Sequence, residues 1–159
     1  MAHAQVATPV SQSCHSVPFV ELRDSLPSHI DLISPFVDPL MGFISRFRED
    51  NYSEIELALR EALVNAVVHG NQQDPHKRVY VKCRCGVDGE VSLTVEDEGR
   101  GFENHVIADP SSSDHRLRTR GRGIDLITAL MDEVDFERGG SAVHMRKRAT
   151  ASSDTRKPQ

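Results

Sequence analysis

The chain has 159 residues, of which 38% are hydrophobic and 27% are charged. This length fits one domain, and the composition is typical of a globular protein that builds its core without a metal ion or a disulfide. The net charge of −5 argues against a protein that wraps DNA. No hydrophobic run approaches the roughly 18 residues of a transmembrane helix, and the N-terminus lacks a secretory pattern, so we expect a cytoplasmic protein that does not contact a membrane.

Periodicity divides the chain into one domain, residues 17–148, between two polar tails, residues 1–16 and 149–159. Alternating hydrophobic residues predict strands, and hydrophobic residues at every third or fourth position predict helices. The expected elements are, in chain order, a strand at 17–23 ended by Ser25 and Pro27, helices at 38–48 and 53–69, strands at 79–85 and 91–95, a loop at 98–120, a helix from 121, and strands at 134–137 and 142–146. Their sum is an α+β fold, a two-layer sandwich with helices on one face of a mainly antiparallel sheet.

Local signals set the expected ends of the first two helices. Asp38-Pro39 combines a capping carboxylate with a proline at the first helical position, which predicts a helix start. Ser53 and Glu56 have the spacing of a capping box and predict the start of the second helix. Gly70-Asn71 predicts its end.

The second helix carries two polar residues between hydrophobic stripes. The stripes are Ile55, Leu59, Ala62 and Ala66 on one side, and Leu57, Val64 and Val68 on the other. Glu61 and Asn65, one turn apart, lie between these stripes and away from the solvent face that Glu56 and Arg60 mark. Polar side chains in such a place either pair with each other or line a cavity. The residues alone leave both interpretations open.

Two pairs of glycines follow. Asp97 ends an alternating strand and precedes Gly99 and Gly101, which let the backbone come close to a flat or charged ligand, although an ordinary turn would have the same pattern. Gly121 and Gly123 are expected to open a helix, where free amide groups and the helix dipole bind anions, unless they form a flexible hinge. The serine- and arginine-rich loop between the two pairs is typical of a lid over a nucleotide.

The motifs Glu61-x-x-x-Asn65, Asp97-x-Gly99-x-Gly101 and Gly121-x-Gly123 stand in the order of the N, G1 and G2 boxes. By these motifs, residues 17–147 resemble the ATPase superfamily of gyrase, histidine kinases and related chaperones, which has the Bergerat fold. The run from Glu61 to Asn71, together with Asp74-Pro75, is more narrowly similar to the helix of bacterial anti-sigma factors with serine kinase activity. The resemblance implies the Bergerat fold and the binding of ATP with Mg²⁺.

The resemblance also implies a role for each matched residue. Asn65 would coordinate the Mg²⁺ ion that bridges the ATP phosphates. Glu61 would be the general base that activates the attacking hydroxyl. Asp97 would accept a hydrogen bond from the adenine amino group, and Gly99 and Gly101 would let the backbone approach the base.

Gly121 and Gly123 would hold the phosphates at the start of the third helix. At two further positions the sequence departs from the pattern of the family. Ser141 stands where the family often has a threonine that supports the adenine site, and it keeps the hydroxyl group. An arginine before the second glycine pair is expected to contact the γ-phosphate, and we prefer Arg120 over Arg118 for this role.

The resemblance implies a serine/threonine protein kinase that is also an anti-sigma factor. It would sequester a sigma factor and phosphorylate a serine of a small antagonist protein, without contacting nucleic acid, and it leaves a homodimer open. A binding module that holds ATP without transferring phosphate is the main alternative. A histidine kinase is rejected, because the roughly forty residues before the first strong helix do not resemble a phospho-accepting helix pair.

Overall fold

The computed structural model describes residues 17–48, 50–101 and 115–149, with side chains in the last range from Arg122 onward. The predicted tails therefore lie almost entirely outside the described residues. Residues 102–114 of the predicted loop and the side chain of Arg120 lie outside them as well.

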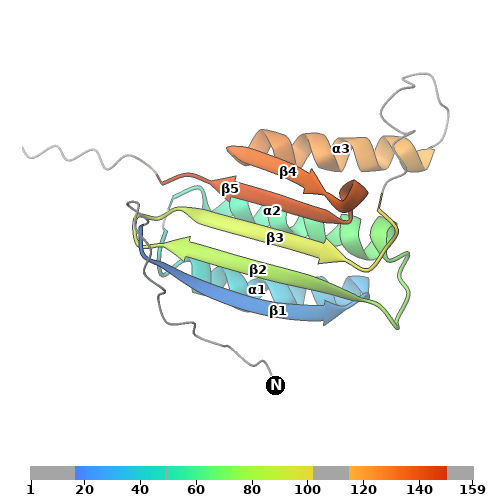
Figure 1. Ribbon diagram of the computed structural model, residues 1–159, viewed down its shortest axis with the longest axis horizontal. Helices are drawn as coiled ribbons and strands as arrows, with labels where there is room; N and C mark the ends of the chain where they lie inside the picture. Colours follow the sequence, from blue (N-terminus) through green and yellow to red (C-terminus); the bar gives the residue numbers. More distant parts are fainter. Residues whose placement is uncertain (1–16, 49, 102–114, 150–159) are drawn as a thin grey trace, which may run out of the picture.

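Among the described residues, a five-stranded antiparallel sheet forms one layer, and helices cover one of its faces (Figure 1). The strands, in the order β1-β2-β3-β5-β4 across the sheet, are β1 (Phe19–Pro27), β2 (Arg78–Gly86), β3 (Val91–Asp97), β5 (Ala142–Lys147) and β4 (Glu133–Glu137). The helices are α1 (Ile33–Ile44), α2 (Tyr52–Val64) and α3 (His115–Leu130), with a π-helix at Asn65–Gly70 and short 3-10 turns at Ile30–Leu32 and Arg138–Gly140. The predicted α+β two-layer sandwich is confirmed.

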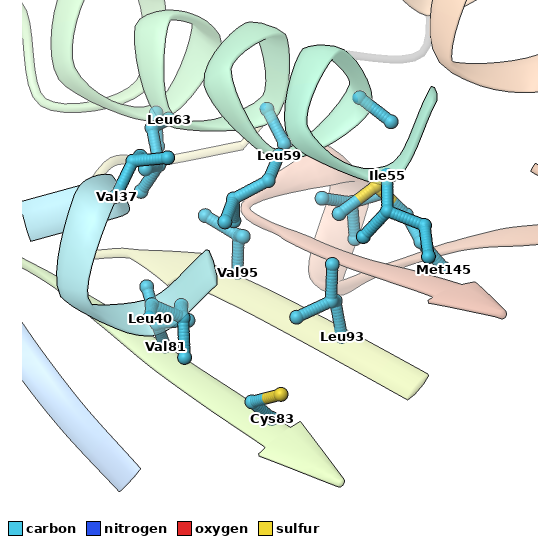
Figure 2. Packing of buried hydrophobic residues seen from close by; sticks show 14 of the residues in the cluster. Val37, Leu40, Ile55, Leu59, Leu63, Val81, Cys83, Leu93, Val95 and Met145 are labelled. Atoms are coloured by element: carbon cyan, nitrogen blue, oxygen red, sulfur yellow. The ribbon is translucent and has the colours of Figure 1, made fainter. Parts of the chain in front are cut away.

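The core lies between the sheet and the helices. Alternate hydrophobic side chains of β2 and β3 face the helices and are at most 2% exposed: Val79, Val81, Cys83, Cys85, Val91, Leu93 and Val95. The antiparallel register sets Val81 opposite Val95, so the buried side chains of the two strands form continuous rows. Figure 2 shows Leu59 of α2 pointing toward Val95 from the other layer. The predicted alternation of both strands is confirmed.

The sheet-facing stripe of α2 and the following π-helix is also confirmed. Ile55, Leu59, Ala62 and Ala66 are at most 4% exposed. Leu57, predicted for a second hydrophobic stripe, is instead 45% exposed. Two residues of α-helix rotate the side-chain direction by about 200°, so Leu57 points away from the sheet that Leu59 contacts. Leu63 and Val67, both fully buried, widen the confirmed stripe.

The first strand is longer than the sequence predicts. Instead of ending after Arg23, β1 pairs with β2 as far as Pro27, which lies opposite Arg78. A proline has no amide hydrogen to donate, but β1 is an edge strand, and its last residue can lack that donor without breaking the sheet.

The start predicted for α1 is wrong. The helix begins at Ile33, directly after a 3-10 turn, so Asp38-Pro39 lies inside it. The additional turn buries Ile33 and Val37, which are 5% and 0% exposed. Burial of two branched side chains contributes roughly 3–6 kcal/mol, which offsets the helical hydrogen bond lost at the proline.

The capping box predicted for α2 does not form. The residue before the helix is Asn51, which has a left-handed backbone (φ 52°) and no side-chain capping bond. The buried guanidinium of Arg48 instead sets the chain direction here. It donates hydrogen bonds to the carbonyl oxygens of Gly89 (3.0 Å) and Arg148 (2.6 Å) and pairs with Asp50 (3.1 Å), which ties this connection to the end of the sheet.

The third helix begins earlier than predicted. Because α3 starts at His115, residues 115–120 are not loop, and Gly121-Arg122-Gly123 lies inside the helix and not at its start. A glycine is needed at position 123 because the helices pack closely there. The Cβ atom of any larger residue would meet the side chains of Glu61 and Asn65. None of the helices in the described ranges combines the length and apolar composition needed to cross a membrane.

Candidate functional site

A pocket lies between α2, α3 and the C-terminal end of β3. Its walls are the hydrophobic side chains of Ala62, Val95, Ile124, Ile127, Phe136 and Val143. Its polar lining includes Asn65, Asp97 and Ser141, which sequence analysis singles out from three separate segments. An apolar cleft with a few placed polar groups is the usual form of a small-molecule site.

Asp97 is the last residue of β3 and is 9% exposed. Its amide donates a hydrogen bond to the carbonyl oxygen of Ser141 (2.9 Å), which extends the β3–β5 pairing into the pocket. Its Oδ1 atom accepts a hydrogen bond from the amide of Gly99 (2.8 Å). The carboxylate is thus held in a fixed direction at the edge of an apolar cavity, where it can accept a hydrogen bond from a ligand amino group.

The glycines around Asp97 are required by close packing. A Cβ atom on Gly70 would lie 2.6 Å from Asp97 Oδ1, and one on Gly99 would lie at the same distance from that atom. Gly101 has a φ of +73°, and a Cβ atom there would lie 2.6 Å from the carbonyl oxygen of Arg138. The backbone at Gly99 therefore lies close to Gly70 and Asp97, and the backbone at Gly101 lies close to the turn at Arg138. Both close approaches in this structure are to the chain itself.

Glu61 of α2 and Asn65, the first residue of the π-helix that continues it, lie on the side that faces α3. Both side chains are half-buried, and neither forms a hydrogen bond with another described residue. A Cβ atom on Gly123 would lie 3.0 Å from Glu61 Cδ and 3.1 Å from Asn65 Nδ2, and nearer still to Glu61 Oε1. The alternative of a hydrogen-bonded pair within the helix is therefore wrong, and both groups line the gap between the two helices.

Ser141 follows a turn with unusual backbone geometry. Arg138, Gly139 and Gly140 all have positive φ values, of 51°, 65° and 92°. The hydroxyl of Ser141 donates a hydrogen bond to the carbonyl oxygen of Arg138 (3.2 Å). Because Ser141 also holds the amide of Asp97, it joins this strained turn to the carboxylate and stabilises the local geometry of both.

The donor set of the pocket fits ATP and Mg²⁺. Among the described residues, no three His, Cys, Asp or Glu side chains gather as a metal cage. Mg²⁺ does not need such a cage, since it commonly takes one or two protein oxygen atoms, substrate phosphates and water, and the carboxamide of Asn65 carries an oxygen of the kind that it prefers.

Two features of the site escape sequence analysis. Phe136 forms part of the pocket wall from β4, a strand that sequence analysis predicts without indicating that this side chain lines a pocket. Asn71, predicted only as a helix stop, is fully buried beside the Asp97 loop. The signal that could have predicted a buried role for Asn71 is its position as a polar residue directly after Gly70, the glycine that ends the helix. Arg120 cannot be compared with its predicted role, because its side chain lies outside the described residues.

Comparison with known proteins agrees with this geometry. Residues 26–147 match the family described as histidine kinase-like ATPase domain. An anti-sigma F factor from Oceanobacillus iheyensis is 32% identical over 108 residues, which cover 65% of this chain and 73% of that protein. Anti-sigma F factors from a Geobacillus species and from Clostridium perfringens are 33% and 35% identical over 73% and 74% of their lengths, and over 65% and 62% of this chain. The chain therefore belongs to the histidine kinase-like ATPase domain family and is a relative of the bacterial anti-sigma F factors.

Proposed function

We propose that this protein is an ATP-dependent serine/threonine kinase that also sequesters a sigma factor. Its protein substrate would be a serine of a small antagonist protein that competes for the same sigma factor. The observation that carries the proposal is the placement of Glu61 and Asn65. Both are half-buried polar groups without a hydrogen bond to another described residue, and Asn65 lines the same pocket as Asp97.

ATP would bind with its base in the pocket and its phosphates toward the gap between α2 and α3. The carboxylate of Asp97 would accept a hydrogen bond from the adenine amino group, between the hydrophobic walls. Asn65 would hold Mg²⁺, which neutralises phosphate charge when bound. The phosphates would also contact Gly121, Gly123 and Arg120, although the glycines lie within α3, so this contact requires a different position of the first turns of that helix.

Glu61 would act on the protein substrate. It would accept the hydroxyl proton of the serine while the serine oxygen forms a bond to the γ-phosphorus. The bond from that phosphorus to the ADP oxygen then breaks, and ADP leaves with the electron pair. The products are phosphoserine, ADP and the proton carried by Glu61, which returns to solvent.

The regulatory part of the proposal is supported by the relatives. Their name, anti-sigma F factor, implies that these relatives bind a sigma factor. We infer the same class of partner for this chain, in the cytoplasm, with residues 17–148 as the binding and catalytic domain. A pull-down from the host lysate with and without ATP, read by mass spectrometry, tests this. Recovery of a sigma factor only with ATP supports the proposal, and recovery of none contradicts it.

The first prediction concerns nucleotide selectivity. ATP with Mg²⁺ at a hundred times its dissociation constant should stabilise the fold by about 2.7 kcal/mol, which is roughly 5–10 °C in melting temperature for a domain of this size. GTP should give no shift, because guanine presents a carbonyl oxygen where adenine presents an amino group to Asp97. Thermal melting with each nucleotide measures both effects. An equal shift with GTP, or no shift with either, contradicts the assignment of Asp97.

The second prediction uses two glycines in helices. In Gly123→Ala the new methyl group meets the flexible end of Glu61, so the carboxylate must turn away and phosphate transfer should fall at least about tenfold. The control is Gly42→Ala in α1, where a Cβ atom meets nothing within 4 Å. It should raise stability by about 0.5–1 kcal/mol and leave transfer unchanged. Transfer assays beside melting curves check both variants, and equal activity of the two would contradict the placement of Glu61.

A further inference from the structure

Asn71 is a fully buried polar residue that the proposed reaction does not use. Its side chain is 0% exposed and forms two hydrogen bonds that join distant parts of the chain. The Nδ2 atom donates to the carbonyl oxygen of Arg78 at the start of β2 (2.8 Å). The Oδ1 atom accepts from the amide of Glu98, directly after β3 (2.9 Å). Asn71 therefore joins the start of β2 to the residue that follows the pocket residue Asp97.

The bond to Glu98 completes a series along the backbone that carries the pocket carboxylate. Three consecutive amides each have a defined acceptor. The amide of Asp97 donates to the Ser141 carbonyl, that of Glu98 to Asn71 Oδ1, and that of Gly99 to Asp97 Oδ1. The middle amide is the one that a side chain from another element holds, so Asn71 sets the direction of the chain as it leaves the strand.

The π-helix brings Asn71 to this place. The amide of Asn71 donates to the carbonyl oxygen of Ala66 (2.8 Å), a bond spanning five residues that closes the wide turn. Gly70, the last residue of that turn, packs so tightly that a Cβ atom on Gly99 would lie 2.7 Å from its carbonyl carbon. Such wide turns are rare and frequently occur at functional sites. The turn and Asn71 together hold the loop after β3 against the end of the π-helix.

We propose that Asn71 is a positioning residue that fixes the carboxylate of Asp97 and so determines the preference for adenine over guanine. The inference rests on the proposed function, since it assumes that Asp97 contacts the base. Without Asn71 Oδ1, the Glu98 amide would lose the acceptor that fixes it, and the loop after β3 would be free to shift toward another acceptor. The carboxylate of Asp97 would then lose the fixed direction in which it accepts a hydrogen bond from the adenine amino group and repels the carbonyl oxygen of guanine.

The test compares Asn71→Ala with Asn71→Asp. The alanine variant removes both hydrogen bonds, while the aspartate keeps the acceptor for Glu98 and loses the donor to Arg78. We expect the ratio of ATP to GTP affinity to fall about tenfold or more in Asn71→Ala and to stay closer to the wild-type ratio in Asn71→Asp. Titration of the full chain with each nucleotide and Mg²⁺ measures this ratio.

The matched control is Arg48→Lys, which weakens another buried polar bridge at the opposite end of the sheet, near Gly89 and Lys147. It should lower the melting temperature without changing the affinity ratio, because loss of stability alone does not reorient Asp97. A folded Asn71→Ala with the wild-type ratio would overturn this inference alone. A wild-type chain that binds neither nucleotide would overturn the proposed function with it.

Hydrogen exchange of the wild-type chain supplies a readout that needs no nucleotide and no variant. The Glu98 amide should exchange slowly, although its residue is exposed, because Asn71 Oδ1 holds it. In a folded variant lacking that acceptor, the same amide should exchange faster, while the amide of Leu93 in the middle of β3 stays protected. Fast exchange of the Glu98 amide in the wild type would overturn the inference even if Asn71→Ala fails to fold.

Discussion

Replacement of Glu61 by Gln is expected to lower phosphate transfer from ATP to the antagonist serine by about 10²–10⁴-fold, the usual contribution of a general base. Glutamine keeps the size of the side chain and its place in the gap beside Gly123, but it cannot accept the serine proton. ATP affinity should change little, because Asn65 and the Asp97 pocket hold the nucleotide. Radiolabelled ATP with the purified antagonist measures transfer, and a nucleotide titration measures binding.

The same helix offers a matched control. Glu56 is a carboxylate on the solvent side of α2, where it accepts a hydrogen bond from Arg60 (2.8 Å). Glu56→Gln removes one negative charge from α2, as Glu61→Gln does, but away from the pocket, and it should leave transfer at the wild-type rate. Full activity of Glu61→Gln would remove the role assigned to Glu61. A wild-type chain that binds ATP and transfers no phosphate would favour the alternative of a binding module without turnover.

Replacement of Asn65 by Ala is expected to abolish the Mg²⁺-dependent binding of ATP. The substitution removes the carboxamide, with the oxygen that we assign to the ion, and keeps the Cβ atom of this half-buried side chain. Because the side chain has no hydrogen bond to another described residue, the melting temperature of the free protein should stay close to that of the wild type. Calorimetric titration with ATP, with and without Mg²⁺, together with a melting curve, gives both results.

A conservative substitution controls for the loss of the side chain itself. Asn65→Asp keeps an oxygen atom of the kind that Mg²⁺ prefers, so it should retain more ion-dependent affinity than Asn65→Ala. Chelation of Mg²⁺ should bring the wild type to the level of the alanine variant. If Asn65→Ala melts far below the wild type and still binds ATP with Mg²⁺, Asn65 stabilises the fold and does not hold the ion.

The fold follows from the sequence where local patterns and burial agree. The alternation through Val81 and Val95 predicts two paired strands, and the spacing of Ile55 and Leu59 predicts the face of α2 that meets them. Helix starts were predicted less well, because long-range contacts decide them. Burial of Val37 extends α1 in front of a proline, and the bonds from Arg48 to the sheet replace a capping box.

The site was predictable in part for the same reason. Helical periodicity alone places Glu61 and Asn65 on one side of α2, and the end of an alternating strand places Asp97 at the edge of the sheet. The partner of Asn71 is 27 positions away, at Glu98, and no local pattern relates the two. The glycine pattern predicts a helix start at Gly123. Its packing against Glu61 instead depends on how α2 and α3 meet, which no local pattern indicates.

A crystal structure of the chain with ATP and Mg²⁺ would test the proposed nucleotide site most directly. We expect the adenine base in the pocket between Val95 and Ile127, with its amino group donating a hydrogen bond to Asp97. We also expect the Asn65 oxygen among the ligands of the ion and the γ-phosphate on the side of Glu61. A base bound outside this pocket, or an ion held without Asn65, would contradict the proposed site.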